Sequence, residues 1–196
     1  MKPKIRAILE KLESLEDELR AELKNQEQNL QYRLEGTRVL FDQKVRETHA
    51  RLRMGLLPWF RASSWRNILS APIIYGMIVP LALLDISITV YQAVCFRLYG
   101  IPRVNRSRYM VIDRHYLSYL NLVEKLNCMY CGYGNGVIAY SREIISRTEQ
   151  YWCPIKHARD YPGMHRRYGK FLPYGEADNY REEVLKFREA LKEEKD

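Results

Sequence analysis

Residues 68–96 read ILSAPIIYGMIVPLALLDISITVYQAVCF, and this stretch decides the fold class of the 196-residue chain. Its one charged residue is Asp85, and the nearest basic residues on either side are Arg66 and Arg97. A helix over this range is about 43 Å long at about 1.5 Å per residue. That exceeds the roughly 30 Å hydrocarbon core of a bilayer. The stretch therefore predicts a membrane segment.

Asp85 is the objection to this prediction, because an aspartate near the middle of a membrane helix costs about 2.5–3.5 kcal/mol on the insertion scale. The Ile, Leu, Val and Phe residues of the segment return roughly 4–8 kcal/mol in total on the same scale, so insertion remains favoured. As a membrane-buried acid, Asp85 could form an ion or proton site. It could also contact Ser87, Thr89, Gln92 or another protomer. We prefer such a contact, because a single acid makes no proton relay.

Two prolines, Pro72 and Pro80, interrupt the segment. Pro72 can occupy a first helical turn, whereas Pro80 lies in the interior, removes a backbone hydrogen bond and predicts a kink. A single span is favoured. A re-entrant hairpin bending at Pro80 and a buried helix of a water-soluble core stay open as alternatives. The basic residues flanking the two ends are equal in number, so they do not orient the segment.

Residues 1–58 predict a long amphipathic helix. Apolar residues recur in steps of three and four at Ile5, Ile8, Leu12, Leu15 and Leu19, which is the spacing of a coiled coil. The helix is expected to pair with a second copy of the chain or with a protein partner. The alternative is an amphipathic helix that folds back onto the carboxy-terminal part of its own chain.

The positive charge of the chain is concentrated after the hydrophobic segment. Residues 97–175 carry 13 basic minus 5 acidic side chains, or +8, and residues 176–196 carry 5 minus 8, or −3. Beside a membrane segment, such a field favours anionic lipid headgroups. Nucleic acid is not favoured as a partner, because no nucleic-acid motif accompanies the charge. The expected basic surface comprises Arg103, Arg106, Arg108, Lys156, Arg159, Arg166, Arg167 and Lys170.

Residues 99–175 predict a small helical module. A short strand is expected over 109–112, followed by helices over 113–127 and 137–152 that are joined by the turn 128–136. Arginines and glutamates alternate over 141–152, and we expect them on a solvated face rather than buried against Asp113 or Arg114. A final amphipathic helix is expected within 176–196, capped by Asp178 or Asn179.

The chemistry of this module lies in Cys128, Cys131, Cys153 and His157. A Cys-x-x-Cys turn directs two thiolates toward one ion, and Cys-x-x-x-His spaces two further ligands one helical turn apart. Three thiolates and one imidazole form a closed tetrahedral set that suits structural zinc. An iron–sulfur cluster, a redox dithiol and plain buried thiols are the alternatives.

The run Cys-Met-Tyr-Cys-Gly-Tyr at residues 128–133 resembles the metal-binding knuckle of rubredoxins and zinc ribbons. The resemblance covers six residues and implies a metal ligand pair, but no fold.

The sequence thus predicts an all-α membrane protein. Its parts are an amphipathic or coiled-coil helix (1–58), a hydrophobic helix (65–98), a basic cysteine-bearing module (99–175) and a carboxy-terminal helix (176–196). The expected function is that of a non-catalytic membrane-anchored adaptor or scaffold, with the cysteine module on the cytoplasmic side. A membrane-associated redox or iron–sulfur protein using the four metal-ligand candidates is the alternative. A transport accessory in which Asp85 titrates is a third. The chain contains no nucleotide-binding glycine loop and no serine nucleophile elbow.

Overall fold

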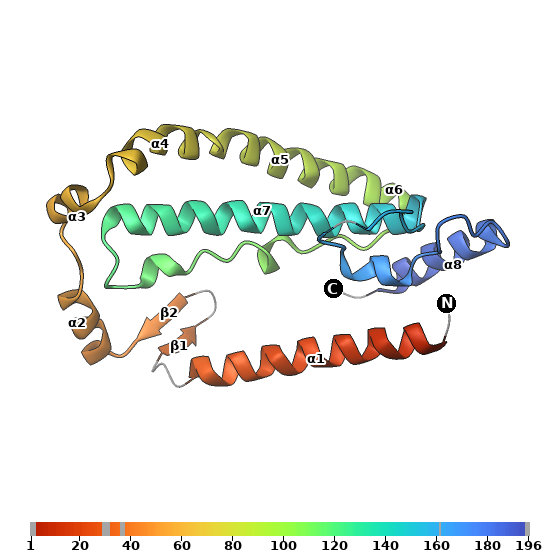
Figure 1. Ribbon diagram of the computed structural model, residues 1–196, viewed down its shortest axis with the longest axis horizontal. Coiled ribbons are helices and arrows are strands. Elements are labelled where there is room, and N and C mark those ends of the chain that lie inside the picture. Colours follow the sequence, from red (N-terminus) through yellow and green to blue (C-terminus); the bar gives the residue numbers. More distant parts are fainter. Residues whose placement is uncertain (1–2, 29–31, 36–37, 161, 195–196) are drawn as a thin grey trace. The chain divides into compact units, whose positions relative to one another are not determined.

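A computed structural model of the chain describes residues 3–28, 32–35, 38–160 and 162–194 (Figure 1). These residues are mostly helical, as the sequence predicts. In chain order the elements are α1 (Pro3–Gln28), β1 (Tyr32–Glu35), β2 (Arg38–Phe41), α2 (Gln43–Arg51), α3 (Leu56–Ala62), α4 (Trp65–Gly76), α5 (Ile78–Tyr91), the π-helical η1 (Gln92–Phe96), α6 (Arg97–Tyr99), the 3₁₀ turns η2 (Arg106–Arg108) and η3 (Arg114–Tyr116), α7 (Leu122–Trp152), the 3₁₀ turn η4 (Arg166–Lys170) and α8 (Tyr180–Glu193).

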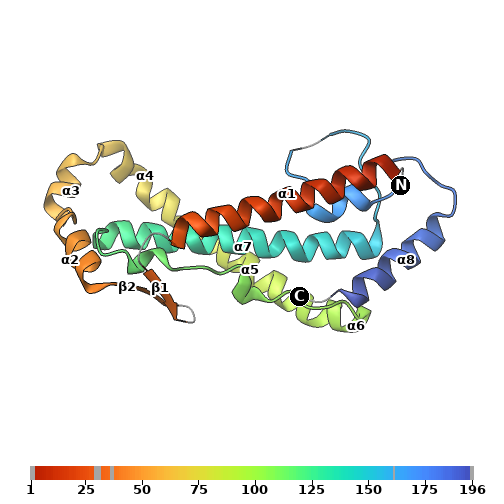
Figure 2. The same cartoon turned by 90° about the horizontal axis from the view of Figure 1, so that it is seen from below.

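The chain divides into two compact units. The N-terminal unit comprises Glu13–Leu81 and Met110–Gly136, and the C-terminal unit comprises Met1–Leu12, Ala82–Tyr109 and Val137–Asp196. Helices α1, α5 and α7 each contribute residues to both units. Within the N-terminal unit, α2 and β2 lie beside the start of α7 in both views of the ribbon (Figures 1 and 2).

The predicted helix over residues 1–58 is correct only for α1. An antiparallel hairpin follows it, with Tyr32 opposite Phe41 and Glu35 opposite Arg38. The reason is a change in the spacing of apolar residues, which alternate with charged residues in β1, the period of a strand, and fill the last three positions of β2. The short helices α2 and α3 come next, and Pro58 occupies the first turn of α3, where a proline is tolerated.

The apolar stripe of α1 is exposed. Ile8, Leu12, Leu15, Leu19 and Leu23 are each between 51 % and 61 % accessible to solvent. The helix therefore has the stripe that a coiled coil requires, and its pairing with a partner stays a prediction.

Helices α4, α5 and α6, with η1 between the last two, form a helical stretch of 35 residues, Trp65–Tyr99. It begins at Ser64, whose side chain accepts a hydrogen bond from the Arg66 backbone N–H. It ends at Gly100, which adopts the left-handed conformation with φ of 68°. The break between α4 and α5 falls at Met77. This agrees with the predicted kink at Pro80, since a proline clashes with the carbonyl four residues before it.

Helix α7 corrects the predicted pair of helices joined by a cysteine turn. It runs without interruption from Leu122 to Trp152, so the Cys-x-x-Cys segment is helical and forms no knuckle. Its start is a reciprocal capping box. The Asn121 side chain accepts from the Glu124 N–H at 3.0 Å, and the Glu124 carboxylate accepts from the Asn121 N–H at 2.8 Å. The strand predicted over 109–112 is also wrong, because this stretch forms no element.

The glycines of α7 permit close packing rather than a turn. A Cβ atom on Gly132 would lie 3.1 Å from the carbonyl oxygen of Val111, and one on Gly134 would lie 3.3 Å from Leu81. The glycines therefore let two other segments of the N-terminal unit approach the axis of α7. The same glycines, considered without these distant contacts, are the reason that a turn is predicted over residues 128–136.

Replacing Gly132 by alanine is expected to lower the free energy of unfolding by about 1–2 kcal/mol, because the added methyl group overpacks against a backbone carbonyl. Gly76 is the matched control, since no atom lies within 4 Å of its ideal Cβ position. Alanine there should stabilise the helix by up to about 1 kcal/mol. Thermal unfolding of both variants in detergent, followed by circular dichroism, provides the comparison. Equal effects at the two sites would contradict the close approach.

The predicted carboxy-terminal helix is confirmed as α8, with Asn179 at its N-cap. Val184 and Leu191 are buried on its inner face. The Gln150 side chain donates to the Phe187 carbonyl at 3.1 Å, and the Arg188 guanidinium lies 4.5 Å from the centre of the Tyr151 ring. These contacts hold α8 against the end of α7 within the C-terminal unit.

Candidate membrane surface

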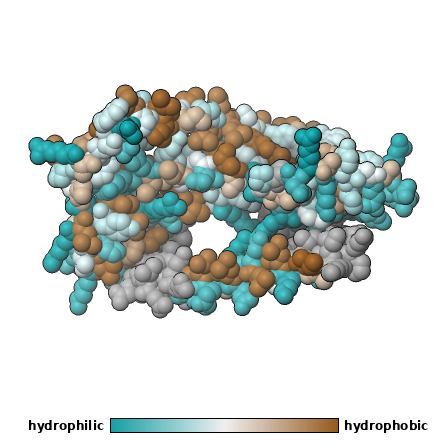
Figure 3. All heavy atoms as spheres, in the orientation of Figure 1, coloured by the Kyte–Doolittle hydropathy of each residue, from teal (hydrophilic) through white to brown (hydrophobic). Residues whose placement is uncertain are grey.

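One face of the hydrophobic helix is apolar and exposed. From α5 to α6 the residues on this face recur in steps of four, three, four, four and four, which places them on one side of a helix. They are Val79, Leu83, Ile86, Val90, Val94 and Leu98, each between 54 % and 74 % exposed. Apolar atoms gather over α4 and α5 in Figure 3. Only 6 % of the most apolar 18-residue window is buried, whereas a core helix of a water-soluble protein would be mostly buried.

On α5 and η1, the opposite face of the helix is buried and includes the polar side chains of Asp85 and Gln92. Asp85, Ile88, Gln92 and Phe96 are spaced by three, four and four residues, and none is more than 9 % exposed. The usual pattern of a protein in water is the reverse, with polar groups outside and apolar groups inside.

Asp85 lies against Arg106, which follows it by 21 residues in the connection between α6 and α7. The Arg106 Nη2 and Nε atoms donate to the two carboxylate oxygens at 2.6 and 3.0 Å. This two-pronged contact balances the charge of a buried carboxylate and satisfies both of its oxygens. The partner that the structure gives is therefore Arg106, an arginine predicted above to lie on a basic surface, and contacts of Asp85 with Ser87, Thr89, Gln92 or another protomer stay predictions.

Gln92, two helical turns after Asp85, forms hydrogen bonds with the same connection between α6 and α7. Its side-chain oxygen accepts from the Val104 N–H at 3.0 Å, and its amide nitrogen donates to the Val104 carbonyl at 3.3 Å. The amide also donates to the hydroxyl of Tyr140 on α7. Tyr91 and Thr148 form a further hydrogen bond of 3.0 Å between η1 and α7. The buried face is therefore covered by α7 and by residues 101–106.

A second polar network corrects the predicted solvated face of residues 141–152. Arg147 is 3 % exposed and donates to Glu143 at 2.9 Å and to the Pro102 carbonyl at 2.7 Å. Arg167 donates to Glu143 at 2.7 Å and forms two hydrogen bonds with Glu194, at 2.5 and 2.8 Å. The arginine–glutamate spacing of four residues fits either a solvated or a buried helix face. The residues that cover this face are distant in the sequence, since Pro102 precedes Arg147 by 45 residues and Arg167 follows Glu143 by 24.

The electrostatics of Glu143 follow from this network. Burial alone would raise the pKa of Glu143, but the hydrogen bonds and charges of Arg147 and Arg167 outweigh it, so the pKa lies below its ordinary value. A carboxyl group with a lowered folded-state pKa stabilises the fold above its unfolded-state pKa. It loses this contribution as the pH falls through the folded-state value.

We therefore expect the melting temperature of the protein to fall as the pH drops below about 4.3, the ordinary pKa of a glutamate. The Glu143→Gln variant should be less stable at neutral pH and should show a shallower decline in acid. Melting curves between pH 3 and 7 provide the measurement. Parallel declines for the two proteins would show that Glu143 is not responsible.

The four predicted metal ligands lie at different places on α7 and beyond it. Cys128 and Cys131 are in the first third of the helix, whereas Cys153 and His157 follow its last residue. The 22 residues from Cys131 to Cys153 correspond to roughly 33 Å along a helix. Within the described part of the chain, no group of three or more His, Cys, Asp or Glu side chains is placed to hold a metal ion. The zinc centre and its iron–sulfur alternative stay predictions.

The cysteines are free thiols. Partial burial, and after it the charge of Glu149, raises the pKa of Cys153, so its thiol stays protonated at neutral pH. The His157 ring stacks against Tyr168, with 6.1 Å between the ring centres.

Most of the predicted basic surface is on the outside of the molecule. Arg103, Arg106, Arg108, Arg159, Arg166 and Lys170 are exposed, and Lys156 is half-buried. Arg167 does not belong to this surface, because its side chain is 14 % exposed and lies against two glutamates. Arg106 is shared between the surface and Asp85.

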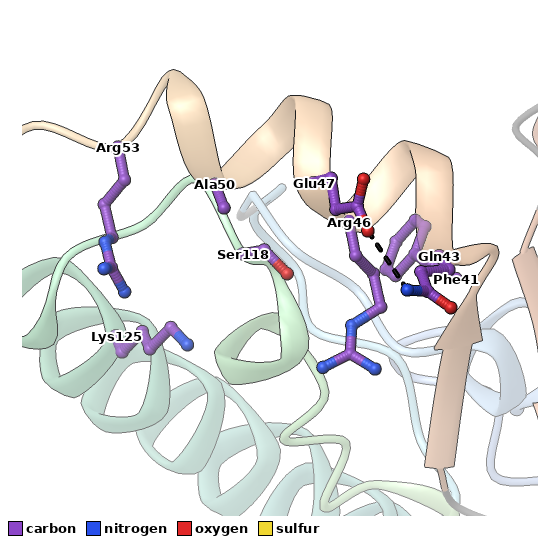
Figure 4. Close-up of a pocket in the computed structure, with 8 residues that line it drawn as sticks. All are labelled: Phe41, Gln43, Arg46, Glu47, Ala50, Arg53, Ser118 and Lys125. Carbon is purple, nitrogen blue, oxygen red and sulfur yellow. Dashed lines mark hydrogen bonds between the residues drawn. The ribbon is translucent and has the colours of Figure 1, made fainter.

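The N-terminal unit also contains a basic hollow that no pattern in the sequence indicates. The hollow has a volume of about 570 Å³ and is lined by Phe41, Gln43, Arg46, Glu47, Ala50, Arg53, Ser118 and Lys125. Figure 4 shows the side chains of Arg46, Arg53 and Lys125 extending from α2, from the residues after it and from α7. The Glu47 carboxylate accepts from Gln43 at 3.1 Å. Three cations against one carboxylate suit an anionic group such as a phosphate.

Comparison with known proteins adds no relative. No protein-family model, no curated protein and no solved structure matches this chain.

Proposed function

We propose that the protein is a non-catalytic adaptor held at a membrane by the helix Trp65–Tyr99. One observation carries the proposal, namely that the exposed face of this helix is apolar while Asp85 and Gln92 are buried beneath it. Lipid tails are a suitable neighbour for the exposed face, and water is not. On the insertion scale, its six apolar side chains favour lipid by roughly 2–4 kcal/mol in total.

The surroundings of the helix support the same function. Trp65 and Tyr99 stand at its two ends, where aromatic side chains favour the membrane interface. The exposed arginines near it, including Arg103 and Arg108, suit anionic headgroups. Free thiols fit a reducing compartment, so the cytoplasmic side is the proposed location of the C-terminal unit.

The exposed stripe of α1 is the proposed recruiting element. Its apolar side chains recur with coiled-coil spacing and are more than half exposed. A second copy of the chain or a helical protein partner would bury this stripe. A membrane-held chain with such a helix fits an adaptor or scaffold.

The double variant Leu83→Asp/Val90→Asp tests the membrane surface. Its partition coefficient on phospholipid vesicles should fall by on the order of a hundredfold or more, because each aspartate is strongly disfavoured in hydrocarbon. The variant should keep its helical content, since both positions are exposed. Vesicle flotation measures the partition coefficient, and circular dichroism measures the helix.

A matched control is Met164→Asp/Leu185→Asp, in which two other exposed apolar residues receive the same charges. It should bind vesicles like the wild-type chain. Equal binding by both double variants would rule out this face of α5 as the membrane surface.

A further inference from the structure

We infer that the helix Trp65–Tyr99 lies along the membrane, embedded in one leaflet, instead of crossing the bilayer. This rests on the proposed membrane anchoring and specifies its geometry. The first observation is length: 35 residues of helix extend about 52 Å. The hydrocarbon core is roughly 30 Å thick, so a crossing would require strong tilt or bending.

The second observation is the position of the charges along the helix. Asp85 stands close to the middle of the Trp65–Tyr99 helix and is joined to Arg106. Arg108 follows in the same 3₁₀ turn and is exposed. If the helix crossed the membrane, this turn would lie near the centre of the bilayer, where exposed arginines are rare and costly.

The third observation is the backbone of the connection between α6 and α7. Apart from the short turns η2 and η3, residues 100–121 form no helix or strand. In the C-terminal unit, Val104 is held at Gln92 and Arg106 at Asp85, so the connection runs back along the helix. In the N-terminal unit, Val111 approaches α7 at Gly132. Exposed irregular backbone does not occur in hydrocarbon, so this connection belongs on the water side.

These three observations agree with the distribution of exposed groups around the helix. One stripe, from Val79 to Leu98, is apolar and free to meet acyl chains. Along α5 and η1 the other side is covered by α7 and the connection, which carry Arg147 and Arg106, whereas no residue of α4 is buried. A helix lying in one leaflet needs a single apolar face, and both of its ends then remain on the same side of the membrane. The equal basic flanks of the segment are consistent with this arrangement, since neither flank has to cross.

The test measures membrane depth at three points along the exposed face. Ile73, Leu83 and Val94 are exposed and span most of the helix. Each is replaced singly by cysteine in a chain whose four native cysteines are serine, and labelled with a nitroxide. Vesicles of phosphatidylcholine and phosphatidylglycerol are the membrane. Collision rates with oxygen and with a water-soluble nickel complex give the depths, and a label at Leu185 on α8 is the control.

Three similar depths, about 5–10 Å below the headgroups, are expected for a helix embedded along one leaflet. A label at Leu83 that lies deeper than both others by about 10 Å or more would overturn the inference, whether the cause is a single span or a hairpin at Pro80. Labels that all stay in water on a chain that does not bind the vesicles would overturn the proposed anchoring as well.

A second measurement uses the native cysteines, in case their replacement prevents folding. Epitope tags at the two ends of the wild-type chain are tested for protease access in sealed membrane vesicles of known orientation. Access to both tags from the same side supports a helix in one leaflet. Access from opposite sides overturns it.

Discussion

Replacing Glu143 by glutamine should lower the free energy of unfolding by about 3–5 kcal/mol, the effect of removing one partner from a buried charge pair. The change preserves the shape of the side chain and removes the charge that Arg147 and Arg167 share. Arg147 is almost fully buried, so its guanidinium has little access to water. For a chain of this size the melting temperature should fall by roughly 10 °C.

The matched control is Glu189→Gln on α8, where the carboxylate is exposed. Its effect should remain within about 0.5 kcal/mol of zero. Thermal unfolding of both variants in the same detergent provides the comparison. A Glu143 variant as stable as the control would mean that the network contributes nothing to the stability of the C-terminal unit.

Replacing Arg106 by methionine is the second large change. It leaves the Asp85 carboxylate buried on an apolar helix without the guanidinium that now binds both of its oxygens. We expect a loss of about 2–3 kcal/mol. This is less than for Glu143, because the Arg106 side chain is 45 % exposed and solvent screens part of the interaction.

Neutralising the carboxylate as well should restore most of the loss. The double variant Asp85→Asn/Arg106→Met is expected within about 1 kcal/mol of the wild-type chain, because no charge then remains buried. Arg108→Met is the control for removing a nearby exposed arginine. Unfolding in detergent at neutral pH measures the stability of the two single variants and the double variant. A double variant less stable than Arg106→Met would exclude charge balance as the role of the pair.

The elements that the sequence predicts best are those determined by local composition. The hydrophobic run at 68–96 agrees with the helix Trp65–Tyr99 within three residues at each end, and Ser64 and Gly100 supply its boundaries. The helix after Asn179 is likewise predicted by its apolar stripe, although the Asn179 side chain makes no capping hydrogen bond. In both cases, the residues that determine the structure are neighbours in the sequence.

The elements that the sequence misses depend on contacts with distant residues. From the sequence alone, the glycines after Cys131 indicate a turn. In the structure they lie within a helix, where Val111 and Leu81 pack closely against them. The partner of Asp85 lies 21 residues away, in a stretch whose arginines have the composition of a solvated surface. The burial of Arg147 depends on the Pro102 carbonyl, which follows a different helix. Local periodicity contains no information on any of these pairs.

The candidate membrane surface likewise has one part that the sequence predicts and one part that only the structure shows. The apolar segment is predictable because membrane insertion depends on composition, but the inverted exposure of its two faces requires the packed structure. The predicted metal set combines residues by type and by spacing along the chain. Such spacing does not establish proximity when a continuous helix such as α7 separates two ligands from the other two.

The most direct test of the account is the fractionation of the full-length wild-type chain after expression in cells. Membranes are washed with high salt and then with alkaline carbonate, which remove proteins held only by charge or by other proteins. We expect the chain to remain in the membrane pellet and to be released only by detergent. Recovery of a folded, detergent-free monomer in the aqueous fraction would contradict it.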